Sequence, residues 1–479
     1  MLGAFDILVI GAGPGGHEAA IRSVKLGLKT AIIEKQGWGG TCTHRGCIPT
    51  KALLACSRRY SELKKLGRMG VSVKNAAFDY AAMKRHQKQI VNISALGARK
   101  SLEESGAETK EGVGRILSPS EVEWTAPDGR SERISARNVV IAWGSVPALP
   151  PDVYPSERIL TSDGLLALQA LPESILIVGG NVIGVEFATY LAELGVRVTL
   201  IEMMERLIPL EDEETSALLT RELKNLGVVI HTGMRLAAIA DDHSKVQLSI
   251  LPEPFSTTDP QRQVHSDASS AGRRDKGLEA TGPAGIRNLS ADYALICTGR
   301  KPHLHAEELD ALGIGYDRRG IVVDERLMTA VPGIFAIGDV TGGMMLAHRA
   351  MYQGKILARN LYNDQSIPFR EETVPSVIYT HPQVARVGLT EEDARRRGIV
   401  VEVHRADFGA NITARTSLKG PGFVKILFDR EKLVGATIAG DQAAELIAPL
   451  SLAMAAGLDR HQLEEWIIPH PTLSELLRI

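Results

Sequence analysis

Two cysteines carry the clearest chemistry in this sequence. Cys42 and Cys47 lie five residues apart in the glycine-flanked segment 39–51, a spacing that can close a small disulfide ring. Pro49 suits the first turn of a helix, so we expect Cys47 near a helix N-terminus, where the dipole stabilises a thiolate. A strained, thiolate-prone pair is typical of a redox couple. The alternatives are two structural thiols or half of a zinc site, for which only His44 lies close.

A glycine-rich turn predicts a dinucleotide site. Gly11, Gly13 and Gly16 follow the apolar run 5–10 and precede a helix-like stretch, and Glu34 stands 23 residues after the first glycine. Such glycines let the backbone approach a pyrophosphate at a helix N-terminus, while the carboxylate accepts a hydrogen bond from a ribose hydroxyl. The alternative is a glycine-rich turn that binds no ligand.

The same unit recurs 168 residues later without a gap. In the second copy we expect a strand at 175–178 and a helix at 185–194, with a glycine turn between them. The residues that match in register are Gly11 and Gly179, Gly16 and Gly184, Glu18 and Glu186, Gly27 and Gly195, and Glu34 and Glu202. Two strand–helix–strand units predict two doubly wound α/β domains.

The second copy departs from the first at one position that would touch a nucleotide. Asn181 replaces the second glycine; asparagine tolerates a left-handed backbone, but its side chain would crowd a pyrophosphate. Glu202 favours NAD over NADP because a carboxylate repels a 2′-phosphate. Arg197 is the nearby cation that argues weakly for NADP.

Composition places these motifs in an ordinary globular protein. At 479 residues, the chain is long enough for about three domains. Lys and Arg number 55 against 57 Asp and Glu, so the net charge of -2 gives no general attraction to nucleic acid or an anionic membrane. Four cysteines are too few for a disulfide-stapled secreted scaffold, and we see neither a secretion signal nor an apolar run that could span a bilayer. We expect a reducing cytoplasm.

Two further segments differ in character. Residues 252–290 are rich in Pro, Ser, Asp and Gly, and we expect an exposed insertion between strands. We expect buried strands in the segments 291–300 and 333–339, each closing on a glycine. Beyond about 347 the segments alternate like an antiparallel sheet and include an apolar helix at 443–458, which predicts a third, α+β module.

Taken together, these motifs make the chain similar to the pyridine nucleotide–disulfide oxidoreductases, and most similar to their dihydrolipoamide dehydrogenase branch. The resemblance covers the chain except for 252–290. It rests on the Gly11 turn, GGTCTHRGCIPTK at 39–51, the Gly179 unit, AIGD at 336–339, MLAHRA at 345–350, VIYTHPQVARVGLTEED at 377–393 and HPTLSE at 470–475.

The resemblance implies a domain order, cofactors and an assembly. Residues 1–145 and 291–346 would form the FAD-binding and central part, 146–290 an NAD-binding domain with the insertion, and 347–479 an interface domain. The FAD residues would be Gly11, Gly13, Gly16, Glu34, Lys51, Gly144, Asp339 and Ala347, and the NAD residues Gly179, Gly184, Glu186, Glu202 and Gly299. A symmetric homodimer is implied, without bound metal.

The resemblance also implies catalytic roles. Cys47 would be the thiol next to the flavin and Cys42 the outer thiol that attacks the substrate disulfide. Lys51 would pair with Glu186 beside the flavin ring; by residue type alone, both are more readily two solvated helix charges.

His470 and Glu475 would form an acid–base pair, with His470 reaching the other subunit's active site. A histidine can take a proton from a dithiol near neutral pH, and a carboxylate on its second nitrogen would fix the tautomer. However, Thr472 and Glu475 also form a capping-box pattern, so Glu475 could be purely structural.

The implied activity is oxidation of dihydrolipoyl groups on a carrier protein by NAD⁺, through a Cys42–Cys47 disulfide and FAD, in either direction. Alternatives are an NAD(P)H-dependent reductase of another disulfide, or a flavoprotein that mainly docks other proteins. Two positions depart from the family pattern: Ile468, commonly a second histidine, and Val182, often an aromatic that shields the flavin. We expect both to change nicotinamide access.

Overall fold

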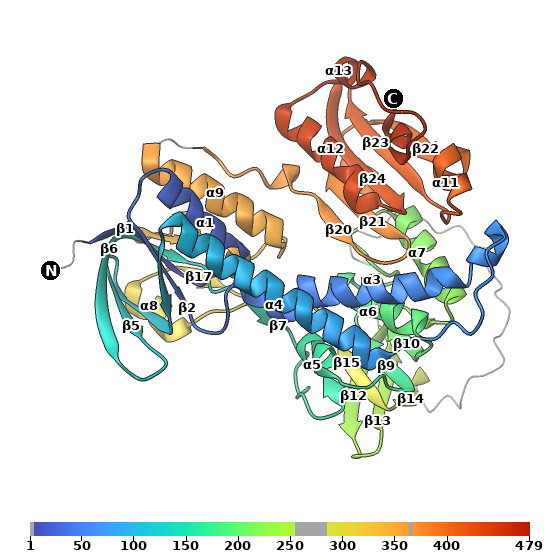
Figure 1. Cartoon of the computed structure of the whole chain (residues 1–479), viewed down its shortest axis with the longest axis horizontal. Helices are drawn as coiled ribbons and strands as arrows, with labels where there is room; N and C mark the ends of the chain where they lie inside the picture. The colour runs from blue at the N-terminus through green and yellow to red at the C-terminus, as the bar shows by residue number, and fades with distance from the viewer. Residues whose placement is uncertain (1–3, 254–284, 364–366) are drawn as a thin grey trace. The chain divides into compact units, whose positions relative to one another are not determined.

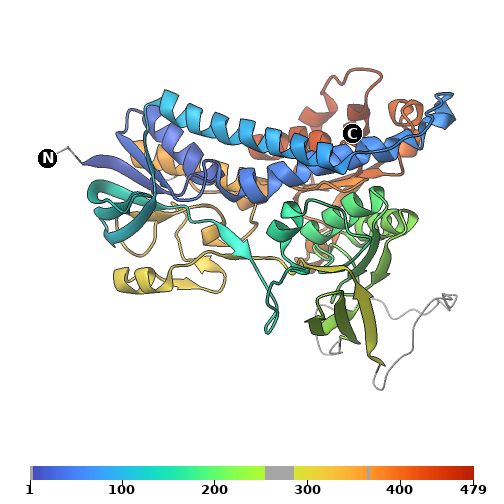
Figure 2. The same cartoon turned by 60° about the horizontal axis from the view of Figure 1, so that its bottom comes forward.

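The computed structural model describes residues 4–253, 285–363 and 367–479. The chain divides into two compact units. Unit 1 comprises residues 1–148, 162–170 and 299–479, and unit 2 comprises 149–161 and 171–298. Figure 1 shows the elements of the whole chain and Figure 2 turns the same cartoon by 60°.

Unit 1 contains a sheet whose centre is the first predicted strand. The strand order is β3-β2-β1-β6-β5-β4, with β19 also paired to β6. The bounds are β1 Phe5–Ile10, β2 Thr30–Glu34, β3 Glu108–Glu111, β4 Val113–Ser118, β5 Glu121–Thr125, β6 Ser131–Ile141 and β19 Ile334–Ala336. β1 is parallel to both β2 and β6. β4, β5 and β6 pair antiparallel, so the sheet is mixed. The apolar runs of β1 and β2 are buried along most of their length, as expected in its parallel part.

Unit 1 also contains helices, some of which contact this sheet. They include α1 Pro14–Lys25, α2 Gly40–Arg45, α3 Cys47–Leu63, α4 Tyr80–Ser105, α5 Ser162–Ala167, α8 Ala306–Leu312 and α9 Ala347–Asn363. α1 and α9 lie side by side in both views (Figures 1 and 2). Their backbones approach so closely that a Cβ atom on Gly354 would lie 2.5 Å from the Gly15 carbonyl oxygen. α3 and α4 also pack against each other.

Unit 2 confirms the predicted repeat. Its parallel sheet has the order β11-β10-β9-β15-β8, built from β11 Val229–His231, β10 Arg197–Ile201, β9 Ser174–Val178, β15 Tyr293–Ile296 and β8 Ile159–Leu160. α6 Val182–Glu193 connects β9 to β10, and α7 Glu213–Asn225 connects β10 to β11. The expected strand–helix–strand order is therefore present in both copies.

A second, antiparallel sheet in unit 2 corrects one sequence prediction. It contains β12 Met234–Asp241, β13 Val246–Pro252 and β14 Arg287–Ala291 in that order. We expected an irregular insertion to continue to about residue 290, but β14 begins at Arg287 because it pairs with β13, Ile250 opposite Arg287. The rest of that expected segment, 254–284, lies outside the described residues.

The C-terminal part of unit 1 forms the expected α+β module. Its antiparallel sheet has the order β20-β21-β24-β23-β22, from β20 Ser376–Ile378, β21 Gln383–Gly388, β24 Lys432–Gly440, β23 Phe423–Asp429 and β22 Glu402–Asp407. The predicted apolar helix is α12 Ala443–Ala456, followed by α13 Arg460–Glu464 and the short 3₁₀ helix η7 Leu473–Leu477. β23 does not alternate between buried and exposed side chains, since every residue except half-buried Asp429 is buried. Val424, Ile426 and Phe428 belong to the core cluster that also contains residues of α12.

The doubly wound α/β fold with a C-terminal α+β module is confirmed. Within the described ranges, no helix is long and apolar enough to cross a membrane.

Candidate active site

The two cysteines lie where two helices meet. Cys42 belongs to α2 and Cys47 is the first residue of α3, with Gly46 between the two helices. Both side chains are half-buried, and no disulfide joins them in this structure. The expected position of Cys47 at a helix N-terminus is confirmed, so the backbone N–H groups of the first turn of α3 surround its sulfur with partial positive charge.

A hydrogen bond joins the two thiol side chains. It raises the pKa of Cys42 well above the usual thiol range, and burial and the charge of Cys47 raise it further, against an opposing effect of Lys51. The two thiols are therefore close enough to share a hydrogen bond, as a redox pair requires.

Lys51 lies one helical turn beyond Cys47 on α3. Its Nζ is 4.7 Å from the centre of the Tyr379 ring, which directly follows β20. Sequence reasoning singled out the segment 377–393 but not Tyr379, because an aromatic beside a lysine 328 positions away leaves no periodic signal. Glu186 is buried, 3% exposed, on α6 of unit 2. The pairing of Lys51 with Glu186 spans the two units and stays a prediction.

The first glycine turn has the shape that a dinucleotide requires. Gly11 has a φ of 108°, and a Cβ atom there would lie 2.3 Å from the Ala142 carbonyl oxygen. By contrast, a Cβ atom on Gly13 would meet nothing within 4 Å. Gly13 therefore borders open space at the N-terminus of α1, the position where a pyrophosphate binds.

Glu34 is already held by backbone donors. Its Oε2 accepts from the N–H of Ala12 at 2.7 Å, and its Oε1 accepts from the N–H groups of Gln36 at 2.7 Å and Gly37 at 3.1 Å. These bonds fix the carboxylate beside the glycine turn, and a carboxylate oxygen retains a further lone pair for a ribose hydroxyl.

The second turn repeats this geometry. Glu202 Oε2 accepts from the N–H of Gly180 at 2.6 Å, and Oε1 from the N–H of Met204 at 2.7 Å. Gly184 is needed for close packing, because a Cβ atom there would lie 1.8 Å from the Gly179 carbonyl oxygen. Glu34 and Glu202 are thus held in the same way, because backbone N–H groups donate to both oxygens of each carboxylate.

Asn181 differs from our expectation. Its φ is -92°, an extended conformation, so the tolerance of asparagine for left-handed geometry is not used. Instead its side chain accepts a hydrogen bond from the N–H of Val182 at 2.9 Å and caps α6. The Asn181 side chain lies at the N-terminus of α6 because it accepts from the Val182 N–H group, a donor that has no partner within the helix.

The remaining nucleotide candidates lie at element boundaries. Asp339 is in the 3₁₀ helix η4 Gly338–Thr341, and Ala347 is the first residue of α9. Gly144 has a φ of 74° and borders open space. Gly299 begins the last segment of unit 1, whereas the other four NAD candidates belong to unit 2, so its grouping with them stays a prediction.

Glu475 has both of the roles considered for it, because it contacts His470 and also takes part in a capping box. Its Oε1 lies 2.9 Å from Nδ1 of His470, and its Oε2 accepts from the N–H of Thr472 at 3.1 Å within a capping box. The hydrogen bond to His470 and that from Thr472 lower the pKa of Glu475. Because the ionised carboxylate only accepts, Nδ1 carries the proton and Nε2 is left as a base. The His470 side chain is 72% exposed.

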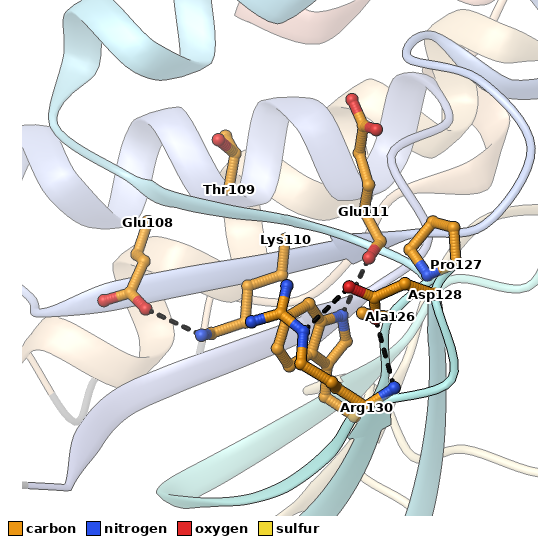
Figure 3. A pocket seen from close by; sticks show the side chains of 9 residues that line it. Glu108, Thr109, Lys110, Glu111, Ala126, Pro127, Asp128 and Arg130 are labelled. Atoms are coloured by element: carbon orange, nitrogen blue, oxygen red, sulfur yellow. Dashed lines mark hydrogen bonds and ion pairs between the residues drawn. The ribbon is translucent and has the colours of Figure 1, made fainter.

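A cavity of about 380 Å³ opens elsewhere on unit 1, beside β3 and the β5–β6 turn (Figure 3). Four of its charged side chains form two pairs, Lys110 with Glu108 at 3.1 Å and Arg130 with Asp128 at 2.8 Å, while Glu111 pairs with Arg99 outside the lining at 2.7 Å. None of the predicted site residues lines it. Nor does any cluster of three or more metal-binding side chains occur among the described residues.

The comparisons with known proteins decide the family. Residues 5–354 match the family described as pyridine nucleotide-disulphide oxidoreductase, and residues 374–478 match its dimerisation domain. The chain belongs to this family. Pyridine nucleotide-disulphide oxidoreductases are flavoproteins, and this membership supports FAD and NAD as the cofactors.

Individual members of the family cover the whole chain. A dihydrolipoyl dehydrogenase of Chlorobaculum tepidum is 35% identical over 99% of this chain and 96% of its own length. Among solved structures, LpdA from Mycobacterium tuberculosis has a TM-score of 0.87 at 25% identity, covering 98% of this chain and 97% of its own. The HOCl-induced flavoprotein disulfide reductase RclA from Escherichia coli has a TM-score of 0.81 at 26% identity, covering 99% and 98%.

Proposed function

We propose that this flavoprotein disulfide oxidoreductase is an NAD-dependent dihydrolipoyl dehydrogenase that acts on lipoylated carrier proteins. The observation that carries the proposal is the hydrogen-bonded pair of Cys42 and Cys47 at the N-terminus of α3. The full-length similarity to a dihydrolipoyl dehydrogenase supports the choice of substrate.

The two cysteines have different roles in the proposed reaction. In the oxidised protein they form a disulfide, and a substrate thiolate attacks the outer sulfur, Cys42, to give a mixed disulfide with release of Cys47 as a thiolate. The second substrate thiol then attacks the substrate sulfur of this bond, so that the substrate leaves as its disulfide and the protein keeps a dithiol. The helix dipole at Cys47 supports this order.

His470 and Glu475 supply the base. With its proton fixed on Nδ1 by Glu475, His470 can take a substrate thiol proton at Nε2. The exposure of His470 and the match of 374–478 to a dimerisation domain support a homodimer in which His470 serves the partner's cysteines.

FAD, when bound, supplies a two-electron relay between the dithiol and the nicotinamide. The residues at the first turn fit it: open space at Gly13, a clamped Glu34 and the N-terminus of α1. Asp339, Gly144, Ala347 and Lys51 would hold its remaining parts. Our division of the chain into FAD, NAD, central and interface segments remains part of this proposal.

Glu202 supports NAD as the nicotinamide cofactor. Its buried carboxylate would face the ribose 2′ position and repel a phosphate there. The nearby cations are occupied: Arg206 donates to the carbonyl oxygens of Pro209 and Glu211, and Arg197 lies 3.8 Å from Glu173.

The similarity to RclA favours a second candidate, an NAD(P)H-dependent reductase of another disulfide. A steady-state comparison separates the two. We expect fast reduction of NAD⁺ by free dihydrolipoamide and faster turnover with lipoylated carriers, and negligible reduction of glutathione disulfide by either nicotinamide. Negligible turnover of dihydrolipoamide by FAD-loaded protein would contradict the proposal.

A further inference from the structure

Three side chains of unit 1 form a connected chain beside Gly144. Arg300 lies at the start of β16 (Arg300–Pro302), which pairs antiparallel with β7 (Ser145–Pro147). Arg300 Nε donates to the Ser145 hydroxyl oxygen at 2.8 Å, and Nη2 donates to the Ser145 carbonyl oxygen at 2.7 Å. The Ser145 hydroxyl in turn donates to Oδ2 of Asp339 at 2.6 Å.

The direction of these bonds is fixed by chemistry. A guanidinium can only donate, and a serine hydroxyl has a single proton. Because Ser145 accepts from Arg300, its proton points to Asp339. Ser145 is buried, 6% exposed, and the fork of Arg300 holds both its hydroxyl and its backbone.

This arrangement commits only one oxygen of Asp339. Within the described part of the chain, Ser145 is the only side chain that hydrogen-bonds the Asp339 carboxylate. Oδ2 is engaged and Oδ1 is left to accept from a ligand hydroxyl. Asp339 is half-buried at the start of η4, so a ligand can reach it.

The charge of Arg300 acts on more than one group. It interacts with Asp339, Asp163 and Cys47, while Arg45 opposes it, and burial lowers the pKa of Arg300. An arginine remains charged even so. Arg300 therefore keeps a fixed positive charge next to the hydrogen-bonded pair of Ser145 and Asp339.

We propose that Arg300 is a positioning residue of the flavin site, which orients the Asp339 carboxylate through Ser145. This inference rests on the proposed placement of Asp339 at the flavin. Because the Arg300 fork and the Ser145 hydroxyl belong to one chain of hydrogen bonds, loss of either should have the same effect.

The inference is tested by titrating FAD into apoprotein. Arg300→Met and Ser145→Ala should each weaken FAD binding about tenfold, the fold-change for losing about 1.4 kcal/mol of a charge-assisted hydrogen-bond chain. Arg300→Lys keeps the charge but not the fork, and should weaken binding by less than Arg300→Met. Arg133→Met, which removes an exposed arginine of β6, is the matched control and should bind FAD like the wild type.

The double variant Arg300→Met with Ser145→Ala separates positioning from a merely structural role. Since both changes break the same chain of hydrogen bonds, the double variant should also bind FAD about tenfold more weakly than the wild type. Independent structural roles of the two residues would make the two losses add.

Wild-type FAD affinity for both Arg300→Met and Ser145→Ala would overturn the inference, as would additive losses in the double variant. If Arg300→Met does not fold, Arg300→Lys and Ser145→Ala, alone and combined, decide the test. Failure of the proposed function is distinguishable, because wild-type protein itself would then lack dithiol turnover.

Discussion

At the scale of single residues, position makes the two thiols unequal. Cys47 is the first residue of α3 and lies at its dipole, whereas Cys42 belongs to the short helix α2. A dithiol that is asymmetric before any substrate arrives can release one defined sulfur on reduction, which is what an ordered exchange requires.

Cys47→Ser should abolish the long-wavelength absorption band of the two-electron-reduced protein, because the band needs a thiolate beside the flavin. Cys42→Ser should show such a band already in the oxidised protein. Cys47 then has no disulfide partner, so no reduction is needed to form its thiolate. Absorption spectra of both variants with FAD bound check this. A band that survives in Cys47→Ser would contradict the assignment.

Asn181→Gly should tighten NADH binding by about threefold to tenfold, because the side chain that crowds the pyrophosphate position is removed. Loss of the cap on α6 costs only a few tenths of a kcal/mol when glycine replaces asparagine, so the melting temperature should hardly change. Calorimetric titration with NADH measures the effect. Unchanged or weaker binding would show that Asn181 is not in the way.

At the scale of elements, the helix that begins at Cys47 is bound to the C-terminal module by ion pairs. Arg58 of α3 forms an ion pair with Asp441, which follows β24 and also pairs with Lys419 at 2.5 Å. These contacts fix the far end of α3 against the module that carries His470.

Asp441→Asn should destabilise the protein by about 2 kcal/mol, because two partly buried cations lose their counter-charge. Denaturant unfolding of the FAD-loaded protein measures the change. Asp128→Asn is the control: its exposed pair with Arg130 should contribute less than about 0.5 kcal/mol.

The capping box of η7 predicts a pH effect. The pKa of Glu475 is below its ordinary value of 4.5 in the folded protein, so its stabilising contribution is present at neutral pH and is lost as the pH falls through the acid range. Glu475→Gln should therefore flatten the fall of melting temperature between about pH 5 and 3. It should also lower dithiol turnover at neutral pH, since an amide supports the base less well.

At the scale of the whole molecule, the proposed site is complete only in a dimer. The cysteines and the acid–base pair would come from different copies of the chain, so dissociation would remove activity without unfolding either subunit.

Mixing two inactive variants tests this arrangement. Cys47→Ser and His470→Gln homodimers should each be inactive, whereas subunit exchange between them creates heterodimers with one intact site of two. At random exchange, about a quarter of wild-type activity should return. If His470 serves its own subunit, no mixture recovers activity. Light scattering before and after exchange confirms that dimers persist.

The sequence by itself determined the fold class, both glycine turns and the position of Cys47. These features follow from local spacing, because a glycine turn after an apolar strand leaves a short-range pattern. The pairing of His470 with Glu475 came from the family resemblance, since the residue types alone also fit a capping box.

Tertiary structure alone decided which side chains meet across long intervals. Nothing in the sequence shows that the Lys51 ammonium lies over the Tyr379 ring. Nor does it show that Arg300 donates to the Ser145 hydroxyl, which in turn donates to Asp339. It also decided the start of β14 at Arg287, because strand pairing with β13 overrides a composition typical of loops. Such contacts depend on how strands are ordered in a sheet, and no local propensity encodes that order.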